Sequence, residues 1–402
     1  MKRSEGRFLT THVGSVIRPS RLLDLAAASA SASASASASA SASAEGPTGQ
    51  AAYEAELTAD VAEVVRRQAA CGLDVVNDGE FGKASWSNYI LGRISGYEVR
   101  PEQLVPLDWL GRDRDRFPGF FEASDMPRAL VGAPAEVCVG PIAYTGRALI
   151  DRDLKNLAAA GDDPEVRAED VELFFTTVAP ASTAYQGINE YYASEEEYVF
   201  AIAEALREEY LAVHDAGFIL QVDDAVLANM YDHLHSQGEG VWERWADLRI
   251  DALNHALRGI PAEDVRYHVC YGSWHVPHVA DAPLDAIVGH MLRVNAGAYS
   301  IEAANPRHEH EWTVWEEAPL PDDKTLIPGV ITHHTTTVEH PLLVAQRIER
   351  YARILGPERV IAGSDCGFAQ SERTQRVHPE VMWAKYAALV EGAEIASKRC
   401  FG

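Results

Sequence analysis

Tyr267-His268-Val269-Cys270-Tyr271-Gly272 places an imidazole and a thiol one residue apart at the end of an apolar run. Successive side chains of a strand point to opposite faces, so His268 and Cys270 share one face and could bind one ion. Two further ligand-type residues, Glu302 and Cys366, also follow strand-like runs downstream. The sequence therefore predicts a set of one histidine, two cysteines and one glutamate at strand ends.

Strand-like and helical segments alternate along the chain, which predicts parallel βαβ units and an α/β fold. We expect helices of 10 to 20 residues between the strands, such as the one over residues 241–257. Eight strands are expected, starting near Phe8, Leu73, Leu173, Phe218, Val265, Ala298, Leu326 and Val360. Eight such units predict a (β/α)8 TIM barrel with insertions, as a single domain over residues 1–402.

Polar residues occur where the expected strands end, and the carboxyl ends of barrel strands are where active sites of this fold lie. The residues at these ends are Ser15, Glu80, Asp223, His268, Cys270, Glu302, His334 and Cys366. The coincidence of ligand-type residues with one end of the barrel predicts a functional site there.

Two segments interrupt the barrel pattern. Serine and alanine alternate over residues 28–44, a composition typical of a solvated linker or a frayed helix without an amphipathic face. Residues 83–130 are rich in Trp, Pro, Gly and charge, and they predict a long excursion over one end of the domain. An accessory strand is expected over residues 136–142.

The composition excludes two classes of partner. Aspartate and glutamate outnumber lysine and arginine by 60 to 35, giving a formal net charge of −25. Such a surface repels nucleic acid and anionic membranes, so neither is expected as a partner. With no apolar leader and no run of about 20 apolar residues, a cytoplasmic protein is expected. Five cysteines in a chain of this length predict free thiols rather than a disulfide framework.

Two thiolates, an imidazole and a carboxylate make a tetrahedral ligand set for Zn²⁺. His-x-Cys alone is a weak signal, because a histidine at a strand end is more often a hydrogen-bonded structural residue. The agreement of four ligand-type residues at four strand ends favours the metal site formed by His268, Cys270, Glu302 and Cys366.

Other polar residues allow more than one interpretation. The side chains of Asp223 and Asp224 point to opposite faces of a strand, so only one of them can face the barrel mouth. For either residue, the alternative to substrate binding is a solvated strand end with a helix N-cap. Glu80 is a candidate for substrate binding or a solvated loop acid, and one of His333 and His334 is a candidate proton carrier. Residues 305–312 could hold a second metal, although a solvated loop is the simpler interpretation.

A series of motifs in this chain resembles the catalytic barrel of the cobalamin-independent methionine synthase family, in the same order along nearly the whole chain. They are Thr10-Thr11-His12-Val13-Gly14-Ser15, Asp78-Gly79-Glu80-Phe81, Gln221-Val222-Asp223-Asp224, His268-Val269-Cys270, Ile301-Glu302, Gly329-Val330 with His334, and Asp365-Cys366-Gly367-Phe368. The usual Asp-Glu-Pro-Ala run of the family reads Asp223-Asp224-Ala225-Val226 here.

The resemblance implies Zn²⁺ bound by His268, Cys270, Glu302 and Cys366. It implies that Ser15, Glu80 and Asp223 hold the amino-acid part of a thiol substrate, and that His334 assists proton movement. Asp224 is retained as a further substrate-binding candidate. The implied reaction is transfer of an alkyl group, with methyl as first choice, from a donor to the zinc-activated thiolate of a small thiol.

Three alternatives stay open. Short members of the superfamily include epoxyalkane:coenzyme M transferases, and opening of an epoxide by a sulfonate thiol would require Arg18, Lys83 or Arg307 at the rim. A zinc hydrolase is disfavoured because two thiolates make the metal a poorer acid for water. A zinc-stabilised binding protein without turnover is expected if four protein ligands close the site and Glu302 cannot be displaced.

Overall fold

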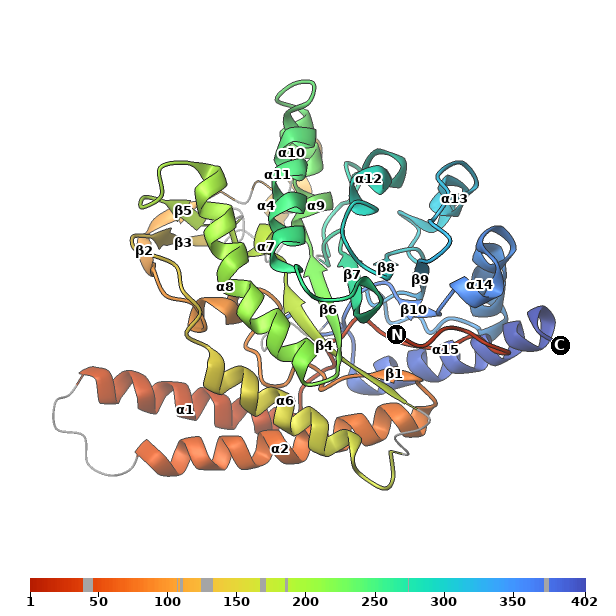
Figure 1. Cartoon of the computed structure of the whole chain (residues 1–402), viewed down its shortest axis with the longest axis horizontal. Coiled ribbons are helices and arrows are strands. Elements are labelled where there is room, and N and C mark those ends of the chain that lie inside the picture. The colour runs from red at the N-terminus through yellow and green to blue at the C-terminus, as the bar shows by residue number, and fades with distance from the viewer. Residues whose placement is uncertain are drawn as a thin grey trace.

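The central feature of the fold is a curled sheet of parallel strands (Figure 1). Seven strands follow one another around it in chain order: β1 (Val75–Val76), β4 (Glu172–Val178), β6 (Ile219–Asp224), β7 (Val265–Val269), β8 (Ala298–Ile301), β9 (Thr325–Ile331) and β10 (Gly363–Ser364). The segment that begins at Phe8 closes the ring, because Thr10 pairs in parallel with Ala362 and Thr11 pairs in parallel with Val75. The predicted (β/α)8 barrel is confirmed.

The computed structural model describes most of the chain. The described residues are 1–38, 46–106, 108, 111–123, 133–166, 171–184, 187–273, 275–371 and 376–402.

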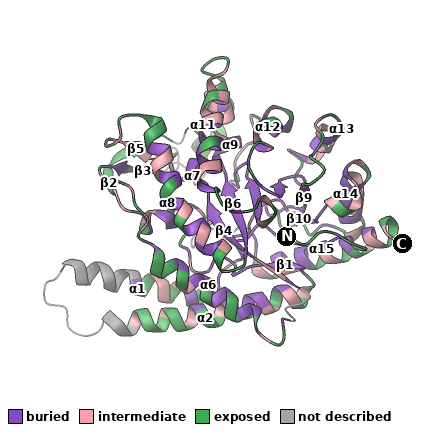
Figure 2. Ribbon diagram, in the orientation of Figure 1, coloured by how far each residue is buried: buried purple, intermediate pink, exposed green. Residues whose placement is uncertain are grey.

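The barrel strands read as nearly continuous apolar runs because both of their faces are buried, one in the barrel interior and one under helices. All residues of β6, β7, β8 and β9 are buried, as the centre of Figure 2 shows. The parallel register sets Asp223 of β6 beside His268 of β7, and His268 beside Ser300 of β8. This register brings polar residues from successive strands to one rim.

Helices surround the ring (Figure 1). They are α2 (Gly46–Cys71), α6 (Arg147–Gly161), α8 (Glu195–Asp215), α11 (Val241–Ala256), α12 (Leu284–Met291), α13 (Val314–Glu317), α14 (Pro341–Leu355) and α15 (Pro379–Cys400). In α14, Val344, Ile348 and Ala352 recur at helical spacing and are buried, which is the apolar stripe that packs a helix onto a sheet. Its first turn begins with Pro341, and the His340 side chain accepts a hydrogen bond from Leu342 N.

Shorter helical segments lie in the loops between these elements. They are η1 (Asn88–Gly92), α3 (Asp113–Arg116), α4 (Pro118–Ala123), α7 (Pro180–Ala184), α9 (Val226–Asn229), α10 (Tyr231–His235), η3 (Ala262–Asp264), η4 (Glu309–Thr313) and η5 (Pro357–Arg359).

The Ser/Ala tract begins inside helix α1 (Ser20–Ala38), which lies beside α2 in Figure 1. Leu22 is buried, and the Arg21 guanidinium forms an ion pair of 3.0 Å with Glu56 of α2. A solvated linker or a frayed helix was expected for the tract, and its residues up to Ala38 are helical. The remainder of the tract falls within residues 39–45, outside the described part of the chain.

The excursion after Lys83 contains regular structure that its sequence pattern did not indicate. Strand β2 (Tyr97–Val105) pairs antiparallel with β3 (Ala133–Cys138), and β5 (Gly187–Asn189) completes a second sheet beside the barrel. The expected accessory strand over residues 136–142 corresponds to β3. Buried Arg93 anchors the excursion, because its guanidinium lies 3.1 Å from Glu209 of α8 and 2.5 Å from Asp153 of α6.

Among the described helices, none combines the length and the apolar composition that crossing a membrane requires.

Candidate active site

A cavity of about 320 Å³ lies at the carboxyl ends of the barrel strands. Its lining combines side chains from strand ends with two loops, residues 85–88 and 367–371, which are joined where Trp86 N donates to Gln370 O over 3.0 Å. The sequence-predicted residues that line it are Ser15, Glu80, Asp223, His268, Cys270 and Cys366. The strand ends therefore bring six of the predicted site residues to one cavity.

Three potential metal ligands gather in this cavity. One donor atom each of His268, Cys270 and Cys366 lies within 4.8 Å of the other two, and all three residues are buried. His268 is the fourth residue of β7 and Cys270 directly follows the strand, so the pleat turns both side chains the same way. Cys366 follows β10 on the other side of the barrel mouth, and its Sγ lies 3.5 Å from Cys270 Sγ.

The donor set fits a zinc ion. With Zn–S bonds of about 2.3 Å, two sulfurs of a tetrahedral site lie about 3.8 Å apart, close to the separation seen here. His268 Nε2 is buried and has no hydrogen-bond partner among the described residues. Its Nδ1 lies 3.3 Å from Ser300 Oγ, the kind of outer contact that orients a ligating imidazole. A buried nitrogen without a partner costs free energy that a metal bond would offset.

The two cysteines differ in their affinity for a proton. The hydrogen bond with Cys366 raises the pKa of Cys270 well above its usual range, and burial adds to the shift. The same hydrogen bond holds the pKa of Cys366 well below its usual range. Burial acts to lower the pKa of His268, but Cys366, Asp223 and Glu302 outweigh it and the pKa is raised. These shifts favour a thiolate at Cys366 beside a protonated imidazole at His268.

Glu302, the fourth expected ligand, lies beside this group but is held by protein donors. Its Oε1 is 3.8 Å from Cys270 Sγ and accepts a hydrogen bond of 3.1 Å from Tyr271 N. Its Oε2 accepts hydrogen bonds of 2.8 Å from both Asn305 and Arg307. Burial raises the pKa of Glu302 to about 7. The structure thus groups three of the four predicted ligands and places the carboxylate next to one of them.

Glu80 reaches the cavity through a strained backbone. Its φ of 61° lies in the left-handed region, and it is the single non-glycine residue with positive φ among the described residues. A conformation that costs about 1 kcal/mol or more persists where other contacts enforce it, and such sites are often functional. Gly14 makes the approach possible, since a Cβ there would meet Glu80 Oε1 at 2.8 Å. Glu80 Oε2 is buried without a partner among the described residues.

Asp223 and Asp224 point in different directions, as the strand pleat requires. Asp223 lines the cavity and accepts a hydrogen bond of 2.6 Å from Gln221 Nε2. Burial raises the pKa of Asp223 to about 8, opposed by the charge of His268. Asp224 lies outside the cavity lining and accepts hydrogen bonds from Val226 N, Leu227 N, Ser182 Oγ and Tyr267 OH. Asp224 therefore lies where the helix-capping interpretation expects it, at the start of α9, and not in the cavity.

Ser15 lines the cavity and contacts the loop that follows Cys366. Its Oγ accepts a hydrogen bond of 3.3 Å from Ala369 N, and its carbonyl accepts one of 2.9 Å from Phe368 N. Gly367 is required at this contact, because a Cβ there would lie 2.0 Å from Ser15 Oγ. The loop after Cys366 is therefore pinned against Ser15.

His334 lines a second pocket, of about 350 Å³, together with His275, His278 and Arg307. Its ring stacks on that of His333, with ring centroids 4.9 Å apart. Burial lowers the pKa of His333 to about 4, opposed by the charge of Cys366, whereas the pKa of His334 is lowered to about 2 by burial, His333 and Arg307. Of the two histidines, His333 is thus the one whose pKa the charge of Cys366 affects.

The three cations expected at the rim for a sulfonate thiol are bound elsewhere. Arg18 donates to the carbonyls of Glu80 and Lys83, and Lys83 Nζ donates to Thr176. Arg307 pairs with Asp281 at 2.6 Å and with Glu302. None of the three lines the cavity; a different cation, Arg376, does. The sequence offered no strand-end signal for Arg376, because it lies in the loop before α15.

The run of residues 305–312, considered for a second metal, is occupied by ion pairs. His308 lies 2.8 Å from Glu311 and 3.4 Å from Asp281, and Glu309 pairs with Arg347 at 3.1 Å. Across the described part of the chain, the group of His268, Cys270 and Cys366 is the one cluster with metal-ligand spacing.

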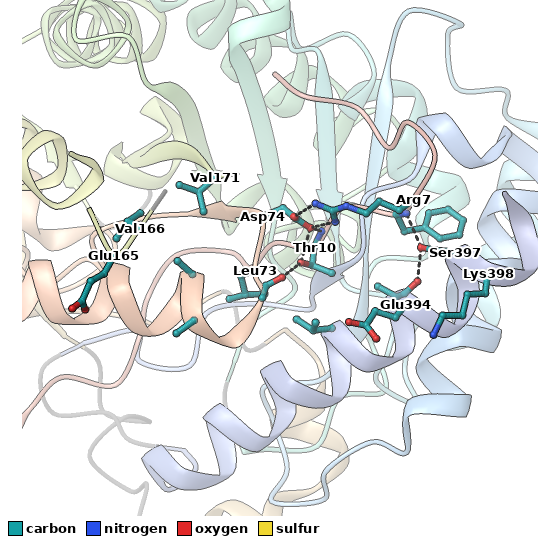
Figure 3. Close-up of a pocket in the computed structure, with 16 residues that line it drawn as sticks. Arg7, Thr10, Leu73, Asp74, Glu165, Val166, Val171, Glu394, Ser397 and Lys398 are labelled. Carbon is teal, nitrogen blue, oxygen red and sulfur yellow. Dashed lines mark hydrogen bonds and ion pairs between the residues drawn. The ribbon is translucent and has the colours of Figure 1, made fainter. Parts of the chain in front are cut away.

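A larger cavity, of about 580 Å³, lies at the amino-terminal end of the barrel (Figure 3). Arg7 and Asp74 form an ion pair there, and Ser397 Oγ accepts a hydrogen bond of 2.9 Å from Phe8 N. These groups satisfy one another, and features at this end of a barrel serve stability rather than catalysis. The smaller cavity is therefore our candidate active site.

Comparisons with known proteins find one family model and several relatives that resemble this chain. Residues 180–388 match the family model described as the catalytic domain of cobalamin-independent synthase. A methionine synthase of Thermococcus kodakarensis is 23% identical over 348 residues, which is 86% of this chain and 84% of that protein. A second relative, an uncharacterised protein of Bacillus subtilis, is 24% identical over 345 residues, 83% of each chain.

Two solved structures share the fold. A B12-independent methionine synthase from Shewanella sp. W3-18-1, in complex with selenomethionine, superposes with a TM-score of 0.66 at 18% identity over 98% of both chains. A putative vitamin-B12-independent methionine synthase from Listeria monocytogenes gives a TM-score of 0.62 at 21% identity, over 97% of this chain and 98% of that one.

Proposed function

The chain belongs to the cobalamin-independent methionine synthase family, and from that premise we propose that it transfers an alkyl group, with methyl as the first choice, to the sulfur of a small thiol. The observation that carries the proposal is the gathering of His268, Cys270 and Cys366 within 4.8 Å, in a cavity that Glu80 and Asp223 also line. A sulfur-rich ligand set and a pair of carboxylates in one small cavity suit a thiol that also bears an ammonium group.

His268, Cys270 and Cys366 would hold Zn²⁺, and Glu302 would be the fourth, displaceable ligand. Zinc bound by these residues would lower the pKa of a substrate thiol, so that the nucleophilic thiolate is present at neutral pH. The fourth position matters, because a catalytic zinc site keeps one position for substrate. In this structure the Glu302 carboxylate accepts hydrogen bonds from Tyr271 N, Asn305 and Arg307. The same donors would stabilise the free carboxylate when a substrate thiol replaces Glu302 as the fourth zinc ligand.

Glu80 and Asp223 would hold the ammonium group of the substrate. Both side chains are buried and line the same cavity, and burial together with the charge of Glu80 raises the pKa of Asp223. A cationic group between them would relieve this repulsion and allow both to ionise. Ser15, whose hydroxyl lines the same cavity, would orient the bound amino acid.

His334 remains our candidate for proton movement. Burial and the nearby His333 and Arg307 lower the pKa of His334, so its imidazole is neutral at physiological pH and would pass a proton on rather than hold it. The stacked His333 links it to the region of Cys366. A proton released by the substrate thiol would then be carried toward the second pocket.

Epoxide opening by a sulfonate thiol such as coenzyme M is the second candidate, and Arg376 in the cavity is the observation that favours it. That complex would leave Glu80 and Asp223 without a cationic partner in a buried site, which is costly. The amino-acid thiol therefore stays first.

Product analysis tests the proposal. Zinc-loaded protein would be incubated with L-homocysteine or coenzyme M, each with a methyl-folate, a methyl-corrinoid and an epoxide, and products would be identified by mass. We expect methionine from one of the methyl donors, and none from the Cys366→Ser variant. S-alkylation of coenzyme M alone would support the second candidate, and the absence of any S-alkyl product would contradict thiol alkylation.

A further inference from the structure

We propose that Arg376 binds the carboxylate of the thiol substrate, so that the cavity selects a zwitterionic amino-acid thiol. This inference rests on the proposed function and names the substrate class more closely. It assigns a role to a residue that the strand-end pattern did not indicate.

Arg376 is the one lysine or arginine among the described residues that line the cavity. It lies between the loop after Cys366 and α15, and it is half-buried. Burial acts to lower the pKa of its guanidinium, and the charged groups that oppose this shift are Cys366 and Cys270. The guanidinium therefore lies in the same cavity as the two sulfurs and within electrostatic range of them.

A hydrogen bond orients the Arg376 side chain. Its Nε donates a hydrogen bond of 3.1 Å to Gln370 Oε1, and Gln370 Nε2 in turn donates to Gly367 O over 2.5 Å. Its two terminal nitrogens have no hydrogen bond and no ion pair in the part of the chain that the structure describes. A guanidinium fixed at Nε presents a planar pair of donors, which is the arrangement that binds a carboxylate through two parallel hydrogen bonds.

The charges around the cavity match a zwitterion. Glu80 and Asp223 offer negative charge for an ammonium group, and Arg376 offers positive charge for a carboxylate. A thiol with an anion and no ammonium would satisfy the arginine and leave two buried carboxyl groups unpaired. A simple aminothiol would pair with the two carboxyl groups and leave the arginine without a partner from the ligand. An α-amino-acid thiol leaves neither side unpaired, and sites with buried polar groups reject ligands that lack the matching group.

Equilibrium binding of two product-like ligands tests the proposal. L-methionine and 3-(methylthio)propylamine differ only in the carboxylate, and calorimetry would measure their dissociation constants for zinc-loaded wild-type protein, Arg376→Gln and Arg376→Lys. We expect wild type to prefer L-methionine by about 10- to 100-fold, the range of a charge-assisted pair of hydrogen bonds. Arg376→Gln should lose this preference, and Arg376→Lys should retain part of it.

The control is Arg353→Gln, which removes an exposed arginine on α14 and should keep the wild-type preference. Because the ratio compares two ligands on one variant, partial misfolding of a variant does not change it. If Arg376→Gln keeps the full preference, this proposal is overturned and the proposed function stands. If wild type binds neither ligand, the amino-acid thiol is overturned together with the role of Arg376.

Discussion

The Sγ atoms of Cys270 and Cys366 lie 3.5 Å apart although 96 positions separate the two residues in the chain. Cys270 follows β7 and Cys366 follows β10, so the curvature of the barrel brings them together across its mouth. Both are free thiols in the structure. The pair exists only because the barrel closes, and it is the structural basis of the proposed metal centre.

Cys366→Ser should weaken zinc binding by about 100-fold or more, because a serine hydroxyl is a poor replacement for a thiolate ligand. Chelator competition on purified protein would measure this, with one zinc per chain expected for wild type. Cys400→Ser, at an exposed position in the last helix, is the matched control and should bind zinc as wild type does. Unchanged zinc affinity in Cys366→Ser would remove Cys366 from the ligand set.

Glu80→Gln should raise the KM for L-homocysteine by about 10- to 100-fold, because the buried carboxylate loses its charge toward the ammonium group. The KM for 4-mercaptobutanoate, which lacks the amine, should change little in the same variant. Steady-state kinetics with both thiols would show the difference. An equal rise for the two thiols would mean that Glu80 does not recognise the amine.

Asp224→Ala should destabilise the fold by about 3 kcal/mol, because it leaves four buried hydrogen-bond donors without an acceptor. Asp223→Asn should stay within about 1 kcal/mol of wild type, because the amide keeps the shape of a carboxyl group that is largely protonated at pH 7. Urea denaturation would compare the two. A stable Asp224→Ala protein with a raised KM would return Asp224 to a substrate role.

His12 should make the protein less stable as pH falls. Burial lowers the pKa of His12 to about 3, and its Nε2 lies 2.6 Å from Gln68 Oε1. The unfolded chain binds a proton near pH 6.5 and the folded chain does not, so stability is full above that pH and declines below it. This group alone should remove about 2 kcal/mol of the free energy of unfolding between pH 7 and pH 5.

Denaturation of His12→Gln at several pH values would test this, since the variant should lose that part of the pH dependence even if it is less stable overall. The matched control is His310→Gln, at an exposed position, which should keep the wild-type slope. An identical slope in wild type and His12→Gln would contradict the assignment.

Much of the barrel could be predicted because its signals are local. Each strand is an apolar run that ends in polar residues, and the spacing of His268 and Cys270 follows directly from strand geometry. The grouping of His268, Cys270 and Cys366 followed from one additional rule, that strand ends of a barrel meet at one rim.

The remaining features depend on contacts between distant segments. Asp223 and Asp224 are equivalent in sequence, and the register of β6 decides which one lines the cavity. Arg376 has no strand-end signal, and it reaches the cavity through the loop that Gln370 and Trp86 hold over the barrel mouth. The pairing of β2 with β3 joins Tyr97 with Cys138, 41 positions apart, and Val105 with Ala133, 28 positions apart, and no periodic pattern within the excursion indicates it.

Zinc K-edge X-ray absorption, recorded on zinc-loaded protein before and after addition of L-homocysteine, tests the central claim most directly. Two sulfur ligands at about 2.3 Å are predicted for the protein alone, from Cys270 and Cys366, and a third is predicted when the thiol is added. A spectrum that keeps two sulfur ligands at saturating L-homocysteine, with coenzyme M and other small thiols equally without effect, would contradict a thiol-activating zinc site.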